Sequence, residues 1–137
     1  MTKASKIIDK MFLNDPFSLW LGIKRISETE GNVVLELTVR EEMLNGFGIA
    51  HGGITYSLAD SALAFSANGY GIQSVSIETS ISHTKPVKKG DVLRTKVEEK
   101  NLTKKTGIYY ITILNQREEE VALFKGTVYR TGKEWEV

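Results

Sequence analysis

The stretch from Asn45 to Asn68 constrains the fold of this chain more than any other part of the sequence. It opens on four glycines and is followed by Gly69, and after the last of the four it is almost entirely small or apolar. This composition predicts a helix that is buried on most sides. Other elements of the chain therefore have to wrap around it.

Two polar features of this predicted helix point to chemistry. Asp60 lies in its middle, where an ionised carboxylate is costly unless it faces a wet cleft or hydrogen-bond donors. The glycines at its start, Gly52 and Gly53, let another group approach the free backbone N–H donors, which favour a developing oxyanion. On one straight helix Gly52 and Asp60 lie about 12 Å apart. If both act on one carbonyl group, Asp60 has to come from a second subunit.

Composition excludes several classes of protein. With 137 residues, 41% of them hydrophobic, we expect one domain over residues 1–137. The 18 basic and 17 acidic residues leave a net charge of +1, which indicates neither a nucleic acid nor a membrane as partner. The absence of cysteine excludes disulfides, thiolate metal sites and a cysteine nucleophile. No stretch resembles a signal peptide or a membrane span, so we expect a cytoplasmic protein.

The remaining patterns predict a short helix and six strands. Apolar residues at helical spacing favour a helix over residues 4–13, and Gly31-Asn32 is a good turn between two strands. From Ser74 to Ser82, Val75, Ile77, Thr79 and Ile81 share one face, which predicts a half-buried strand. The predicted strands cover residues 19–30, 33–39, 74–82, 92–100, 108–115 and 121–130. The expected fold is α+β, with one curved antiparallel sheet around the long helix, and its edge strands favour oligomers.

A set of short motifs carries a resemblance to a known family. They are Asn45-Gly46, His51-Gly52-Gly53, Leu58-Ala59-Asp60, Pro86 with Gly90-Asp91-Val92-Leu93, and Thr106-Gly107 with Val121-Ala122-Leu123-Phe124-Lys125-Gly126. In this pattern the chain resembles the hotdog-fold thioesterases of the phenylacetic-acid-degradation, or PaaI-like, type, from about Val39 to Arg130. The resemblance implies hydrolysis of acyl-coenzyme A thioesters without a metal or redox cofactor.

The resemblance also implies roles for single residues. Gly52 would polarise the thioester carbonyl through its N–H, and Asn45 would hold that carbonyl or the attacking water. Asp60 would activate the water or attack directly, and Ser76 is the best counterpart of a strand serine or threonine that completes the site in some relatives. His51 is a candidate general base. A thioester already has a good leaving group, so a polarised carbonyl and one well-placed base supply most of the help.

Further residues are candidates for binding the substrate. Phe47 and Tyr56 are candidates to line an acyl or aryl pocket, and Gly53 and Thr79 to lie beside the thioester. Coenzyme A carries phosphates, for which the lysines in turns are candidate ligands, namely Lys88, Lys89, Lys104 and Lys105. The family resemblance favours phenylacetyl or hydroxyphenylacetyl groups, then medium-chain acyl groups. It also implies a homodimer with shared sites that pairs into a homotetramer.

Each of these candidates also has a purely structural interpretation. Asp60 could face solvent, His51 could orient a loop, Asn45 could belong to an ordinary turn, and the lysines could be plain surface charges. His83 is better explained as a core or interface residue than as a metal ligand. Two other functions stay open on this fold: a hydratase or dehydratase of acyl thioesters, and a non-catalytic acyl-coenzyme A-binding protein.

Overall fold

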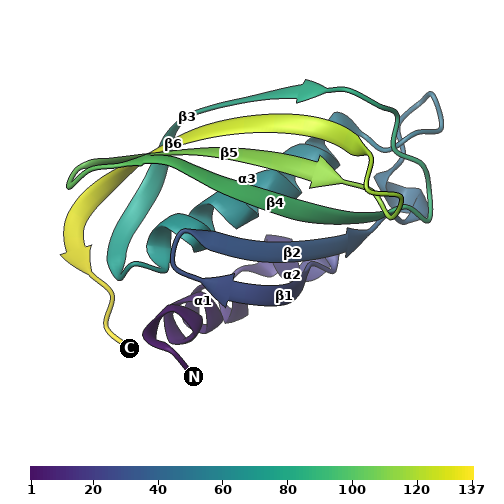
Figure 1. Ribbon diagram of the computed structural model, residues 1–137. Coiled ribbons are helices and arrows are strands. Elements are labelled where there is room, and N and C mark those ends of the chain that lie inside the picture. The colour runs from purple at the N-terminus through teal and green to yellow at the C-terminus, as the bar shows by residue number, and fades with distance from the viewer.

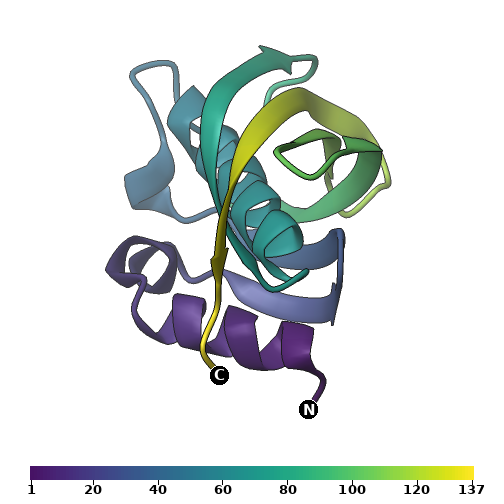
Figure 2. The ribbon, with the colours of Figure 1, turned by 90° about the vertical axis from the view of Figure 1, so that its left-hand side faces the viewer.

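The helix predicted at the centre of the fold is present as α3 (Gly52–Asn68) in the computed structural model, which describes residues 1–137. One six-stranded sheet curves around it, as Figures 1 and 2 show from two sides. The strand order is β1-β2-β4-β5-β6-β3, and every neighbouring pair is antiparallel. The strands are β1 (Lys24–Thr29), β2 (Asn32–Thr38), β3 (Ile72–His83), β4 (Val92–Leu102), β5 (Thr106–Leu114) and β6 (Glu120–Glu134). The α+β hotdog fold expected from the sequence is confirmed.

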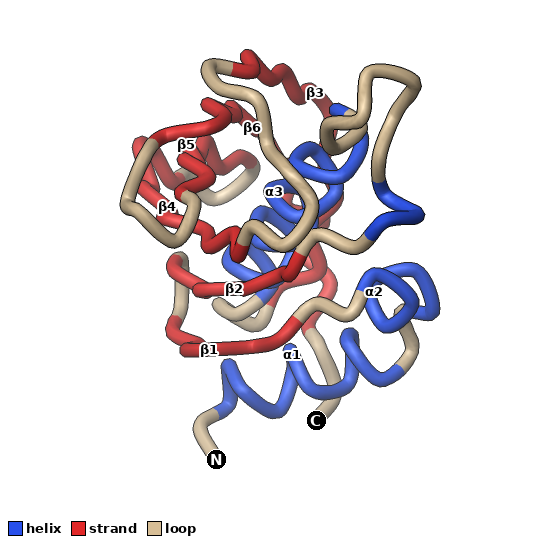
Figure 3. Tube along the Cα trace, turned by 90° about the vertical axis from the view of Figure 1, so that its right-hand side faces the viewer, coloured by secondary structure: helices blue, strands red, loops and turns tan.

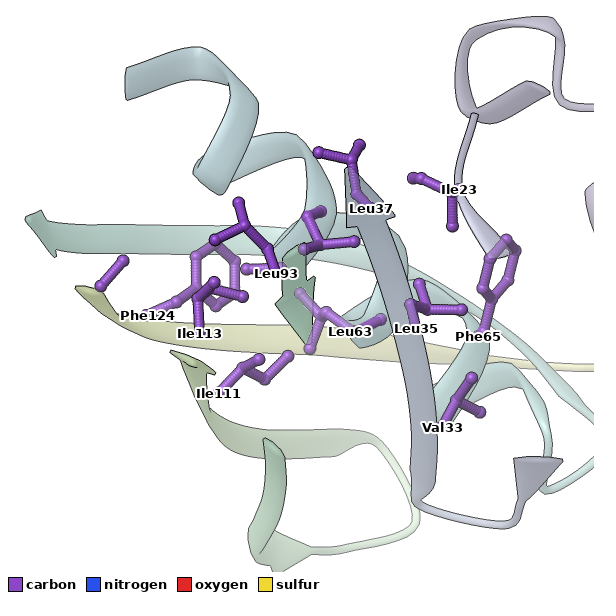
Figure 4. Close-up of a cluster of buried hydrophobic side chains, with 14 of the residues drawn as sticks. Ile23, Val33, Leu35, Leu37, Leu63, Phe65, Leu93, Ile111, Ile113 and Phe124 are labelled. Carbon is purple, nitrogen blue, oxygen red and sulfur yellow. The ribbon is translucent and has the colours of Figure 1, made fainter. Parts of the chain in front are cut away.

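The core lies between α3 and the concave face of the sheet. Leu63 and Phe65 of α3 meet alternate residues of the strands, among them Leu35 of β2 and Ile111 of β5 (Figure 4), and all four side chains are almost fully buried. Gly126 of β6 lets the helix come close to the sheet. A Cβ atom at this position would lie 2.5 Å from Cδ2 of Leu63. The leucine side chain at position 63 therefore fills the space that the missing side chain of Gly126 leaves free.

The hairpin between β1 and β2 confirms the turn predicted at Gly31. Thr29 pairs with Asn32, and Gly31 between them has a φ of 74°, which favours glycine. The N–H of Gly31 donates to the carbonyl oxygen of Ser66 on α3 at 3.0 Å. This contact fixes the hairpin against the last turn of the central helix.

The N-terminal segment contains one helix more than we expected. The predicted first helix is present as α1 (Lys3–Leu13), but the strand predicted from residue 19 is wrong at its start, because α2 (Pro16–Leu21) covers it. Asp15 caps α2 by accepting a hydrogen bond from the N–H of Ser18 at 3.0 Å, and Gly22 ends it with a φ of 76°. None of the helices combines the length and apolar character that crossing a membrane requires.

The two edges of the sheet differ. Along the edge formed by β1 lies α1, where Asp9 pairs with Arg25 at 3.0 Å (Figure 1). The other edge is β3, which pairs only with β6. The prediction that Val75 and Ile77 of β3 are buried is wrong, since they are 57% and 60% exposed. A bulge between Ser76 and Glu78 shifts the alternation along the strand, so that only its second half turns an apolar side chain toward the core.

Candidate active site

The first turn of α3 presents a free backbone donor. His51 is the N-cap of the helix, and its Nδ1 accepts a hydrogen bond from the N–H of Gly53 at 2.9 Å. The N–H of Ile54 donates to the carbonyl oxygen of His51 at 2.9 Å. The N–H of Gly52 has no partner within the chain. It therefore offers the partial positive charge of the helix start to an oxygen acceptor.

Asn45 shapes the loop that leads into this helix. Its Oδ1 accepts hydrogen bonds from the N–H groups of Phe47 at 2.9 Å and Ile49 at 3.4 Å. Gly48, within the same turn, has a φ of 78°. Because the backbone occupies Oδ1, only the Nδ2 amide group of Asn45 remains to donate to a ligand.

A cavity of about 380 Å³ opens beside this glycine end of α3. It lies between the loop before α3, the first turn of the helix and the loop after β3, on the side of the molecule that faces the viewer in Figure 3. The two loops are tied together by the N–H of Ala50, which donates to the carbonyl oxygen of Val87 at 2.7 Å. The lining residues are Asn45, Ile49, Ala50, Gly52, Thr55, His83, Thr84, Lys85, Pro86 and Val87. Gly52 and Asn45, both predicted from the sequence, thus share one cavity.

His83 also lines this cavity, and its interpretation as a core residue is wrong. The residue is exposed, and its Nδ1 lies 3.3 Å from the Oγ1 of Thr55 on the first turn of α3. Neither His83 nor His51 belongs to a group of histidine and acidic side chains that could hold a metal ion. Sequence reasoning missed His83 and Thr55 as residues of the site, although Thr55 follows Gly52 at the spacing of one helical turn.

Asp60 lies farther along α3 and faces a second cavity. Its carboxylate is half-buried, and it has no hydrogen bond or ion pair within the chain. Burial raises the pKa of the Asp60 carboxyl above its ordinary value. The cavity has a volume of about 260 Å³ and is lined by Asp60, Leu63, Ala64, Ser74, Val75, Ser76 and Val128. The structure therefore places Asp60 and Ser76, two of the residues predicted to be catalytic, at one cavity.

The two halves of the predicted site remain apart within one chain. Gly52 and Asp60 are eight residues apart on one continuous helix, which corresponds to about 12 Å along its axis. They line different cavities. A single chain therefore does not place the Asp60 carboxylate next to a carbonyl group bound at Gly52.

Tyr56, Thr79 and Phe47 line neither cavity, and the same holds for His51 and Gly53. Tyr56 of α3 and Thr79 of β3 contact each other, with their hydroxyl oxygens 2.6 Å apart. Tyr56 also packs edge-on against Phe124, with ring centroids 5.6 Å apart. Phe47 lies in the loop before α3 and is 91% exposed. Phe47 and Tyr56 therefore do not contribute to either of these two cavities within one chain.

The candidate lysines fall into two groups at opposite ends of β4. Lys88 and Lys89 precede this strand at the glycine end of α3, and Lys104 and Lys105 follow it in the hairpin to β5. All four are exposed and none forms an ion pair. A strand of this length spans about 35 Å, so one small ligand cannot reach both groups on one chain.

Comparison with known proteins adds independent information. The sequence model of the thioesterase superfamily matches residues 47–122. The chain is 39% identical to the acyl-coenzyme A thioesterase PaaI of Escherichia coli (strain K12), over 95% of this chain and 93% of that protein. The solved structure of E. coli PaaI covers 96% of both chains with a TM-score of 0.93. A hypothetical thioesterase of Streptococcus pneumoniae, solved with coenzyme A, is 28% identical over 82% of this chain and 91% of its own, with a TM-score of 0.78.

Proposed function

This chain belongs to the thioesterase superfamily, within its PaaI-like hotdog branch, and on this premise we propose that it hydrolyses acyl-coenzyme A to a free acid and coenzyme A. As a member of this superfamily, the chain is a thioester hydrolase. The observation that carries the mechanism is the Asp60 carboxylate, half-buried and unpaired, on the helix whose first N–H group is free at a cavity. A solved relative that contains coenzyme A supports the same class of substrate.

The reaction begins with polarisation of the thioester carbonyl. Its oxygen accepts hydrogen bonds from the N–H of Gly52 and from the Nδ2 of Asn45. Asp60, with Ser76 holding a water molecule beside it, accepts a proton from that water while the water oxygen attacks the carbonyl carbon. The tetrahedral intermediate then breaks its C–S bond, and the departing sulfur takes the proton from Asp60. Direct attack by Asp60, with a mixed anhydride that water hydrolyses afterwards, uses the same residues.

The two halves of the site come from two copies of the chain. The outer edge of β3 has no neighbour, and its exposed Val75 and Ile77 offer an apolar surface next to free backbone groups. Pairing of β3 with β3 of a second copy around a twofold axis extends the sheet across both subunits. Such an axis sets the two α3 helices antiparallel and carries the Asp60 of each subunit toward the Gly52 of the other. Pairing of two such dimers gives the homotetramer that the family resemblance implies.

The acyl group we propose is aryl, of the phenylacetyl or hydroxyphenylacetyl type, with medium-chain acyl groups next. The E. coli relative belongs to the phenylacetic acid degradation operon. The cavity at Asp60 is lined largely by apolar or small side chains, including Leu63, Val75 and Val128, which suits an apolar acyl group. The substrate brings its own coenzyme A, and the proposed steps use no other cofactor.

Release of free thiol from a panel of acyl-coenzyme A compounds tests this function. We expect turnover that is fastest with aryl-acetyl compounds and that falls about a hundredfold or more in Asp60→Asn. Asp9→Asn on α1 is a matched control that lies outside both cavities and should keep wild-type activity. Water addition to an enoyl compound without thiol release would identify a hydratase instead. Tight binding of acyl-coenzyme A without turnover would identify a non-catalytic binding protein.

A further inference from the structure

We infer that His83 is a catalytic residue of this chain, whose Nε2–H donates a third hydrogen bond to the thioester carbonyl oxygen, beside the N–H of Gly52 and the Nδ2 of Asn45. This assignment rests on the proposed function and adds a side chain that the mechanism above does not use. His83 ends β3, where it pairs with Ala122 of β6, and from there its ring reaches the first turn of α3.

The ring of His83 approaches Gly52 with Nε2 foremost. A Cβ atom at position 52 would lie 3.0 Å from Nε2 and 3.3 Å from Cε1 of His83. The space that any other side chain at position 52 would fill is thus occupied by the imidazole edge. Gly52 therefore serves two purposes, since it leaves its own N–H open and makes room for the Nε2 of His83.

One oxygen atom can accept from both groups. Standard bond lengths place the nitrogen of Gly52 about 2.5 Å from its Cβ position, so this nitrogen lies at most about 5.5 Å from the Nε2 of His83. Two donors that each lie about 2.9 Å from a shared acceptor can be up to about 5.8 Å apart. The carbonyl oxygen of a thioester bound at Gly52 is consequently within reach of His83.

Thr55 sets the orientation of the imidazole. Its Oγ1 lies 3.3 Å from the Nδ1 of His83 and 3.1 Å from the carbonyl oxygen of Gly52. With Nδ1 beside Thr55, Nε2 is the nitrogen that faces Gly52. Because a carbonyl oxygen can only accept, the proposal requires a proton on Nε2. Either the ring is protonated on both nitrogens, so that Nδ1 donates to Oγ1 of Thr55, or the Thr55 hydroxyl turns from the carbonyl oxygen of Gly52 and donates to Nδ1.

The other polar side chains of the cavity are occupied elsewhere, with the exception of Asn45. Thr84 donates its hydroxyl proton to the carbonyl oxygen of Glu120 at 2.8 Å, and Lys85 pairs with Glu119. His51 accepts with its Nδ1 and keeps a proton on Nε2, but it does not line the cavity. Among the side chains that line the cavity, His83 and Asn45 are therefore the donors that we assign to the carbonyl oxygen.

Two substitutions distinguish a role of His83 as hydrogen-bond donor from a role in which its ring only fills space. His83→Phe keeps the ring and removes both nitrogens, whereas His83→Gln places an amide donor near the position of Nε2. We expect His83→Phe to lower kcat about a hundredfold with KM changed less than threefold, and His83→Gln to recover at least tenfold of that loss. Ser82, one residue earlier on β3, is exposed and lines neither of the two cavities of the site, so Ser82→Ala serves as a control with unchanged kinetics.

Infrared spectroscopy of a carbon-13 carbonyl label gives a second measurement. With labelled acyl-coenzyme A bound to the slow Asp60→Asn chain, we expect His83→Phe to move the carbonyl stretch to higher frequency, toward its value in water, and His83→Gln to leave it low. A folded His83→Phe chain with a kcat within threefold of wild type, or with an unchanged carbonyl stretch, would refute the assignment alone. Absence of thiol release from every compound by the wild-type chain would refute the proposed function as well.

Discussion

Sharing of the active site between two subunits predicts that two inactive chains restore activity when they are mixed. Asp60→Asn removes the carboxylate of one chain and leaves its glycine end intact. Gly52→Pro removes the N–H donor of the other and leaves its Asp60. Proline is tolerated at the first position of a helix, and His51 before it has the extended backbone, φ −60° and ψ 139°, that a residue before proline prefers. The new ring would also displace His83, which belongs to the same end of the site.

The expected recovery follows from counting sites. Because Gly52 and Asp60 lie about 12 Å apart on one rigid helix, each site of the proposed dimer takes its glycine end from one chain and its carboxylate from the other. At equal amounts and full exchange, half of the dimers are mixed. Each mixed dimer has one intact site out of two, so activity should approach roughly a quarter of wild type.

Thiol release is measured before and after exchange, with native mass spectrometry to count mixed dimers and circular dichroism to show that each parent is folded. An exchanged mixture that stays as inactive as its parents would mean that Asp60 acts within its own chain.

Three other predictions follow from single contacts. Burial raises the pKa of Asp60 in the folded state, so as the pH rises this carboxyl ionises first in the unfolded chain, and the stability of the fold falls. Asp60→Asn removes this loss and should therefore raise Tm at pH 7, but not below about pH 4. An unchanged Tm at pH 7 would contradict this prediction. Leu63→Ala and Gly126→Ala should each lower the free energy of unfolding, measured in urea, by about 2–4 kcal/mol. The double variant should lose clearly less than the sum of the two, because the two side chains compete for one space. Losses that simply add would argue against this contact. The double variant Lys104→Ala, Lys105→Ala should have a higher KM at unchanged kcat, and the KM of the wild type should rise with salt. A KM that changes neither with the substitutions nor with salt would mean that these lysines are plain surface charges.

Local signals predicted most of the fold correctly. The glycine-flanked apolar stretch predicted α3, and the strand predicted over residues 33–39 is present as β2. Residues 19–21 were wrongly assigned to the start of a strand, because Leu19, Trp20 and Leu21 are apolar and aromatic enough to resemble one. The capping residues of α2, Asp15 and Gly22, carried the correct signal for a helix.

The polar residues of the site were harder to place, for two physical reasons. Alternation along a strand cannot tell a face that meets the core from one left open at a sheet edge, so Val75 and Ile77 were assigned to the core. The bulge after Ser76 shifts the alternation, so that Thr79 and Ile81 are half-buried while Val75 and Ile77 are exposed. Asp60 could be singled out because a charge within an apolar helix stands out without knowledge of the fold, whereas Ser76 came from the family resemblance; both line one cavity, and their catalytic roles stay predictions.

The position of β3 in the sheet also bears on how the chain is made. This strand pairs only with β6, which ends three residues before the last residue, Val137. During synthesis β3 has left the ribosome long before β6, and it stays without a partner on either edge in the meantime. Pairing between distant segments forms late in folding. The serines and Glu78 that alternate with Val75 and Ile77 keep the waiting strand from being uniformly apolar, which disfavours its pairing with other nascent chains. The edge at which we propose that two chains join is therefore completed only when β6 pairs with β3.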